Sequence, residues 1–382
     1  MVLSKSSPFY LRFSLILFML LLVGFTIYIG QDIIVPLAFA ILLAVLLLPV
    51  NNFLERKGMS RVMAIILSLT VSIVIVGAVI YFLSSQIAGF LRDIPAIKQH
   101  LADHAKTLQE WISAHLNMSK VEQATLINNA AEKVKSTGTV LIGDTFISVT
   151  QGLMIVVLLP VYSFLILYYR DMIKRFIVSL FKHEHHANVI EVLQESKFIV
   201  QGYMTGLMIE MGIVAAINAV GLFLIGIQYP VFLGVLSAIL NMIPYIGMLI
   251  AAVFCMLVTL TTSPNMSDVI WVVVVLTVVQ FIDNNIIMPK VVSSKVKINA
   301  LITILGVLIG GALAGISGMF LSIPGIAILK AIFDRVEELR PWGILLGDDV
   351  TGSRRSALYL KIESIGHRFL YPSPKKPPTL KE

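Results

Sequence analysis

The feature that most constrains this chain is an apolar run from Asn299 to Leu329 that contains no charged residue. A smooth membrane helix needs few backbone breakers, yet this run holds several of them: Gly306, Gly310, Gly311, Gly315, Gly318 and Pro324. A helical segment of this kind has to pack tightly, bend or turn back. The chain is therefore expected to place an irregular helix inside a membrane.

The composition supports a membrane protein throughout. Of 382 residues, 57% are hydrophobic and only 13% are charged, whereas soluble domains carry about 25% charged residues. Apolar runs long enough to span a bilayer recur along the chain, which favours helices over a barrel. The predicted fold class is all-α: a polytopic helical membrane protein with roughly six to eight transmembrane segments.

The net charge of +7 does not indicate nucleic-acid binding, because the basic residues cluster beside the apolar runs and set the topology instead. The single cysteine, Cys255, allows no intrachain disulfide. No cleavable signal is expected at the N-terminus, since the first apolar run, Phe9–Ile29, is long enough to span. The His183-Glu-His-His186 cluster is interpreted as a solvated interfacial turn, with metal binding as the alternative. No cofactor and no metal site are expected.

The chain divides into five expected units. These are residues 1–84 with three spans, 85–144 with extracytoplasmic amphipathic helices, 145–200 with a fourth span and a basic connection, 201–330 with a core of two span-plus-hairpin units, and 331–382 with a cytoplasmic tail. In the second unit an apolar stripe runs from Ile87 to Ile112 at helical spacing. The stripe indicates one helix, and Ser119-Lys-Val-Glu122, with capping-box spacing, indicates the start of a second. We expect the two helices to fold on each other, with a homo-oligomer contact or a lid over a pore as alternatives.

The distribution of basic residues predicts the orientation. The loop from Arg56 to Arg61 and the connection from Arg170 to Lys197 are rich in lysine and arginine, so both are expected in the cytoplasm together with the two chain termini. The connections at 30–32 and 228–230 carry neither residue type and are expected outside.

The same rule indicates two hairpins. As one straight helix, Val231–Thr262 would be roughly 48 Å long, against about 30 Å of hydrocarbon. If it folds back instead, Lys290, Lys295 and Lys297 lie inside, as the rule prefers. By the same logic 299–329 folds back from the inside. The two span-plus-hairpin units of 201–330 would then form an inverted repeat. The alternative is that the glycines after residue 305 form a packing seam in one tilted helix.

Two carboxylates lie deep in apolar sequence. Glu210 and Asp283 each fall in the span of one repeat unit, and a lone carboxylate in a membrane is costly unless it meets water, a cation, a proton or a donor. The alternative for Asp283 is that it caps its span and is neutralised by Lys290. Neutral polar residues that could line the same cavity are Asn218, Asn241, Gln280, Asn284 and Asn285.

Three motifs resemble those of the autoinducer-2 exporter family, a family of bacterial inner-membrane permeases. They are Asn241-Met-Ile-Pro-Tyr-Ile-Gly247, Gln280-x-x-Asp283-Asn284-x-x-x-x-Pro289, and Gly310-Gly311-x-x-x-Gly315-x-x-Gly318 with Pro324. The resemblance covers nearly the whole chain, and it departs at Asn299-Ala300, where the family often has proline second. It implies a secondary carrier in the bacterial inner membrane that exports a small polar solute such as autoinducer-2, with proton or sodium coupling as an option. A cation–proton antiporter is the alternative.

The residues and the resemblance together give one set of predicted pathway positions. The set is Glu210, Asn218, Asn241, Pro244, Gly247, Gln280, Asp283, Asn284, Pro289, Gly310, Gly311, Gly315, Gly318 and Pro324. No phosphate loop, nucleophile elbow or HExxH pair occurs, so the chain is not expected to be an enzyme. An intramembrane enzyme that uses Glu210 and Asp283 as acid and base, or an assembly factor that docks through 85–144, are alternatives of a different class.

Overall fold

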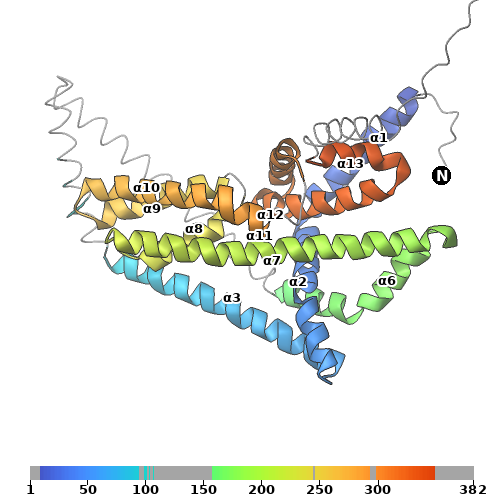
Figure 1. Ribbon diagram of the computed structural model, residues 1–382, viewed down its shortest axis with the longest axis horizontal. Coiled ribbons are helices and arrows are strands. Elements are labelled where there is room, and N and C mark those ends of the chain that lie inside the picture. The colour runs from blue at the N-terminus through green and yellow to red at the C-terminus, as the bar shows by residue number, and fades with distance from the viewer. Residues whose placement is uncertain are drawn as a thin grey trace, which may run out of the picture.

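The structure is a computed structural model that describes residues 9–93, 157–243, 246–292 and 298–348, together with 99–100, 103 and 106. Within this part of the chain every regular element is a helix (Figure 1). Five helices there are long and apolar enough to cross a membrane, and shorter apolar helices accompany them. The all-α polytopic fold is therefore confirmed. The segment 107–156, which carries most of the expected external unit, lies outside the described residues, so that expectation stays a prediction.

Three helices open the chain: α1 (Phe9–Ile29), α2 (Gln31–Arg56) and α3 (Arg61–Arg92). Helix α3 begins where the Ser60 hydroxyl accepts a hydrogen bond from the Met63 amide, which satisfies one of the free N–H groups of its first turn. The predicted third span ended at residue 84, but α3 continues to Arg92. Residues 85–92 contain no proline, and the single glycine among them, Gly89, lowers the helix propensity too little to end the helix. The unit boundary at 84/85 thus falls inside a helix.

The middle of the chain forms one very long helix. After a helix at Val157–Tyr168 come α6 (Arg170–Ser179), the short η1 (His183–His185) and α7 (His186–Leu224). Helix α7 has 39 residues and crosses the expected boundary at 200/201 without a break. The predicted basic connection is therefore three elements: α6, η1 and the first turns of α7. Helix α7 contacts α2, α6, α8, α10, α11 and α12, so it is the central helix of the described part of the chain (Figure 1).

The segment 231–262 folds back on itself. Helices α8 (Pro230–Asn241) and α9 (Ile246–Thr262) contact each other and lie beside the C-terminal half of α7 (Figure 1). At the tip, a Cβ atom on Gly247 would overlap the carbonyl of Leu240, so only glycine permits this close return. The predicted position Pro244 lies outside the described residues. The fold-back over this segment agrees with the hairpin prediction.

The following helix ends in an irregular turn. Helix α10 (Met266–Ile282) passes into a π-helical turn, η2 (Asp283–Ile287), and then into the short α11 (Met288–Val291). Pro289 has no amide hydrogen for the carbonyl four residues before it, and its ring crowds that carbonyl. A wider π turn directly upstream relieves this conflict, and such turns are frequent at functional sites.

The second glycine-rich segment is also a hairpin. Helix α12 (Ala300–Arg335) is interrupted at Ala314 and Gly315, where Gly315 has φ 57° and ψ −144°. Beyond the break Gly318 lies against Gly310, and a Cβ atom on Gly306 would meet Ile326. The glycines therefore line the inner side of a hairpin and are not a seam along one continuous helix.

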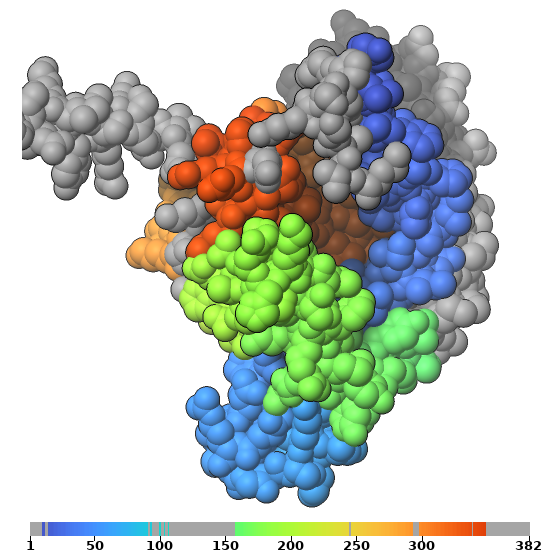
Figure 2. Space-filling view, turned by 90° about the vertical axis from the view of Figure 1, so that its right-hand side faces the viewer, coloured from blue at the N-terminus to red at the C-terminus, as the bar shows by residue number. Residues whose placement is uncertain are grey.

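The chain's described part ends beside the start of α12. After η3 (Glu337–Leu339) and α13 (Arg340–Leu346), the Asn299 side-chain amide donates to the carbonyls of Leu345 and Gly347 at 2.6 and 3.2 Å. Figure 2 shows this end of the molecule, with α6 and the start of α7 in green between the blue α1–α3 and the orange-red α12–α13. The expected boundary at 330/331 therefore falls inside α12, and η3 and α13 of the expected tail pack on the second hairpin.

Candidate functional site

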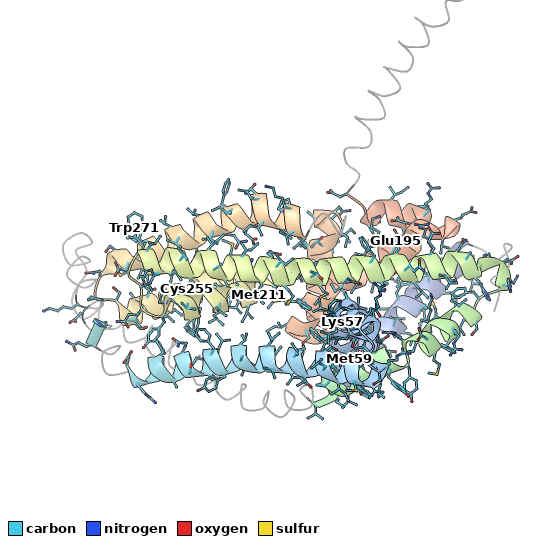
Figure 3. All side chains as sticks on the ribbon, turned by 60° about the horizontal axis from the view of Figure 1, so that its bottom comes forward. Lys57, Met59, Glu195, Met211, Cys255 and Trp271 are labelled. Atoms are coloured by element: carbon cyan, nitrogen blue, oxygen red, sulfur yellow. The ribbon has the colours of Figure 1, made fainter. Side chains whose placement is uncertain are left out.

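Helix α7 supplies the first carboxylate of the candidate site. Buried side chains recur along one face of α7, and this face carries Tyr203, Leu207, Glu210, Val214 and Asn218. Glu210 has 7% of its surface exposed, near the middle of the helix. Its neighbour Met211 lies where α7 passes the hairpin α8–α9 (Figure 3). A glutamate on the packed face of an apolar helix needs a specific partner.

The π turn supplies the second carboxylate. Asp283 is 1% exposed, and its Oδ2 accepts hydrogen bonds from two amide groups. Asn241 Nδ2, at the end of α8, donates at 2.9 Å, and Gln280 Nε2, in α10, donates at 3.4 Å. The Gln280 amide also donates to Asn284 Oδ1 at 3.1 Å. Residues from the hairpin tip and from the end of α10 therefore meet at Asp283.

The two carboxyl groups are neighbours. Glu210 and Asp283 lie close enough to influence each other's charge, where α7 touches the π turn. Glu210 Oε2 and Asp283 Oδ1 are both buried and have no hydrogen-bond partner. Within the described ranges no ion pair includes either residue, so Lys290 does not neutralise Asp283 as the capping alternative required. Two negative charges this close in an apolar setting are costly, and a proton or a cation between them lowers that cost.

A small cavity adjoins the carboxylates. It has a volume of about 20 Å³ and lies between α7, α8, α9 and α10, with four polar residues in its wall: Asn218, Ser237, Asn241 and Gln280. This volume is enough for a water molecule. The Asn218 Oδ1 atom is buried without a partner, which is the kind of group that a buried water satisfies. The cavity extends the polar cluster from the carboxylates towards the interior of the α8–α9 hairpin.

The structure brings together part of the predicted pathway. Six predicted residues gather around the two carboxylates and the cavity: Glu210, Asn218, Asn241, Gln280, Asp283 and Asn284. Gly247 lies in the tip that carries Asn241. Pro289 is exposed. It does not line the cavity, but it favours the π turn that carries Asp283. Pro244 lies outside the described residues.

The second hairpin packs elsewhere. Gly24 of α1 adjoins Leu313, and Phe39 of α2 stacks on Phe320 with ring centroids 5.5 Å apart. The predicted positions on this hairpin, namely Gly310, Gly311, Gly315, Gly318 and Pro324, therefore shape its own fold and its contacts with α1, α2 and α7. In the described part of the chain, the atoms that lie nearest to a Cβ atom built on Gly310, Gly311 or Gly318 all belong to α12 itself and not to the carboxylate pair.

Sequence reasoning missed Ser237. This residue is 4% exposed, lines the cavity and contacts Cys255 Sγ through its hydroxyl at 3.2 Å. Its signal was available, because Ser237 precedes Asn241 by four positions and so shares its face of α8.

Among the described residues no group of three or more histidine, cysteine, aspartate and glutamate side chains could hold a metal ion. In the histidine cluster, His183 and His186 stack with centroids 4.9 Å apart, and His186 Nε2 lies 3.0 Å from the Phe181 carbonyl oxygen. These histidines lie in and directly after the short turn η1 between α6 and α7, and their position at a membrane interface stays a prediction.

Comparison with known proteins places these features in a family. The sequence model described as "AI-2E family transporter" matches residues 16–338. "Putative transport protein YrrI" of Bacillus subtilis is 25% identical over 317 residues, which is 79% of this chain and 86% of the relative. "Putative transport protein YhhT" of Escherichia coli K12 is 27% identical over 333 residues, covering 86% and 92%. "Putative permease PerM" of the same strain is 26% identical over 329 residues, covering 83% and 91%.

Proposed function

The chain belongs to the AI-2E family of transporters, and we propose that it is a secondary carrier that exports a small polar solute of the autoinducer-2 type, coupled to protons or sodium ions. The proposed location is the bacterial inner membrane, with both termini in the cytoplasm, as the basic loops suggest. The apolar stripe in 85–144 supports a homo-oligomer.

The buried carboxylate pair is the observation that carries this proposal. Glu210 and Asp283 face each other inside apolar helices, where a single excess negative charge already costs several kcal/mol, at least about 2.5–3.5 on insertion scales. Such a pair is stable with a shared proton or a bound cation. Its affinity for the proton or cation changes when water gains or loses access to the carboxylates. A carrier that couples ion entry to solute exit needs a site of this kind.

The two hairpins support alternating access. The α8–α9 hairpin lies along the C-terminal half of α7, whereas α12 and α13 lie along the N-terminal half (Figure 1). Hairpins that enter a bundle from opposite ends are typical of inverted-repeat carriers, whose sites lie near the middle of the membrane. Asn241 at the first tip touches Asp283, so movement of this hairpin would change the surroundings of the carboxylate directly.

A cation–proton antiporter is the second candidate function. The size of the cavity favours it, because about 20 Å³ holds water or a small cation but no organic solute. In this case the transport site would consist of the two carboxylates, which bind the cation, and the neutral amides of Asn241 and Gln280, which complete its coordination shell.

Flux measured in sealed proteoliposomes tests both candidates. An imposed proton gradient should drive solute movement in the first case, and proton movement that needs only sodium in the second. Release of a chemical product in detergent, without a gradient, would support an intramembrane enzyme instead. Sealed vesicles with no flux of solute, proton or sodium would contradict the proposed function and favour an assembly factor.

A further inference from the structure

A second cavity lies far along α7 from the carboxylates. It has a volume of about 490 Å³ and opens between α2, the helix at Val157–Tyr168, α6 and the beginning of α7. We call it the α6 groove. None of its lining residues lines the polar cavity near Asp283. Its size falls in the range of small-molecule sites, about 300–1,000 Å³.

The charges in this groove are unbalanced. Arg170 pairs with Glu55 at 2.7 Å and Asp171 pairs with Arg61 at 2.8 Å, so these two lining residues already have partners. Lys174 of α6 and Lys197 of α7 also line the groove, and no ion pair in the described part of the chain uses either one. The groove thus carries two lysines with charges free for an anion.

The inner walls are apolar. Leu48, Ile166, Ile177 and Leu193 come from the four surrounding elements. An anion alone would use the lysines and leave these walls exposed to water. An anion attached to a hydrocarbon chain would use both parts of the groove.

Helix α6 has the character of a membrane-surface helix. It buries none of its residues, and Phe176, in its apolar stripe, is 61% exposed. Lys174 and Arg175 alternate with that stripe, the pattern of a helix that lies in the lipid headgroup region. The groove beneath α6 is therefore expected to open at headgroup level, beside the lipid.

We propose that the α6 groove binds one anionic phospholipid, with its phosphate between Lys174 and Lys197 and an acyl chain along the apolar wall. Basic pockets between membrane helices bind anionic headgroups. A zwitterionic lipid would bring its own cation to the two lysines and would bind more weakly. A soluble phosphate ester lacks the chain that covers Leu193 and its neighbours.

Native mass spectrometry of the full-length protein in detergent tests the proposal. Phosphatidylglycerol and phosphatidylcholine with identical acyl chains are offered at equal concentration, and bound lipid is counted. The wild type should retain phosphatidylglycerol selectively. The Lys174→Gln/Lys197→Gln variant should lose roughly thirtyfold in affinity for it, at about 1 kcal/mol for each lysine. Equal retention of the two lipids by the wild type would overturn the proposal.

A charge-matched control separates the groove from general attraction. Lys57→Gln/Lys182→Gln removes the same charge at two lysines that do not line the groove and should keep the selectivity. Equal losses in both double variants would overturn the proposal. Leu193→Trp fills the groove with both lysines in place and should also reduce phosphatidylglycerol binding, while full displacement of the lipid by glycerol phosphate would show that the chain contributes nothing and would overturn it too.

Discussion

Gly310 and Gly318 pack backbone to backbone across the second hairpin: a Cβ atom on either would overlap the carbonyl oxygen of the other. In a continuous helix residues eight apart are about 12 Å apart along the axis, so this contact exists only because the chain reverses between them. Gly315 makes the reversal with a positive φ, in a region that other residues avoid. The absence of side chains at these positions is therefore what allows α12 to be a hairpin.

Substitution of Gly310 by valine should destabilise the hairpin. The added side chain must push the two halves of α12 apart, and overpacking of this kind costs about 1–3 kcal/mol. The midpoint of thermal unfolding, followed in detergent by loss of the monodisperse chromatographic peak, should fall clearly. Gly325→Ala is the control, since nothing lies within 4 Å of a Cβ atom there. Equal midpoints for the two variants would mean that the close contact is unimportant.

The two ends of Met266–Val291 should be reachable from opposite sides of the membrane. Asn265 and Lys290 are both exposed, and the basic-residue rule places the first outside and the second inside. Single cysteines at these positions, in a Cys255→Ala background, should react with an impermeant maleimide before lysis at Asn265 and only after lysis at Lys290. Labelling of Asn265 only after lysis would mean that 231–262 crosses the membrane once and that the inverted repeat does not exist.

A tyrosine–carboxylate contact ties α3 to the start of α8. The Tyr229 hydroxyl donates to Asp93, and this hydrogen bond, together with partial burial, raises the pKa of Tyr229 from 10.0 to about 12. Because the pKa is raised, the stabilisation is complete below pH 10 and disappears as the pH rises through 12. Tyr229→Phe should cost about 1 kcal/mol at neutral pH. In the tyrosinate absorbance titration, the wild-type minus variant difference should have its midpoint near pH 12; a midpoint near 10 would exclude the contact.

The amide at the first hairpin tip should matter more than its exposed counterpart. Asn241 donates to Asp283 at 2.9 Å, whereas Asn285 only donates to the carbonyl of Phe281 in its own helix. Asn241→Leu removes a hydrogen bond to a charged group, worth about 1.5–3 kcal/mol, and should reduce flux in proteoliposomes sharply. Asn285→Leu makes the same chemical change and should leave flux intact. Equal flux in the two variants would remove Asn241 from the site.

Much of this architecture could be predicted because membrane helices appear in a sequence as long runs without charged residues. The length of 231–262 and the lysines after Asp283 predicted the first hairpin, and the helix breakers in 299–329 predicted the second. The residues at which the helices begin and end could not be predicted. Helix α7 continues through Lys197 because the residues around it are good helix formers, whatever their polarity. Charge marks where a helix leaves the lipid, not where it ends.

The site was predictable in its members but not in its geometry. Carboxylates and amides stand out in apolar sequence, which is why Glu210, Asp283 and Asn241 could be selected. Their meeting depends on the register of the π turn and on where the hairpin tip stops along α10, and neither has a local sequence code. The sequence likewise did not reveal that Gly310, Gly311 and Gly318 pack inside the second hairpin, against other residues of α12.

If the Glu210–Asp283 pair couples an ion to transport, proton-driven flux should depend on the ability of Glu210 to exchange a proton, and the Glu210→Gln protein removes this ability. Glutamine keeps the size of the side chain but cannot exchange a proton. Glu195→Gln is the matched control, since Glu195 is on the same helix but pairs with Arg335 at the end of α12 (Figure 3). We expect Glu210→Gln to reconstitute like the wild type yet to give no more flux than protein-free liposomes, while Glu195→Gln should transport normally. Full flux with unchanged pH dependence in the Glu210→Gln protein would contradict this coupling.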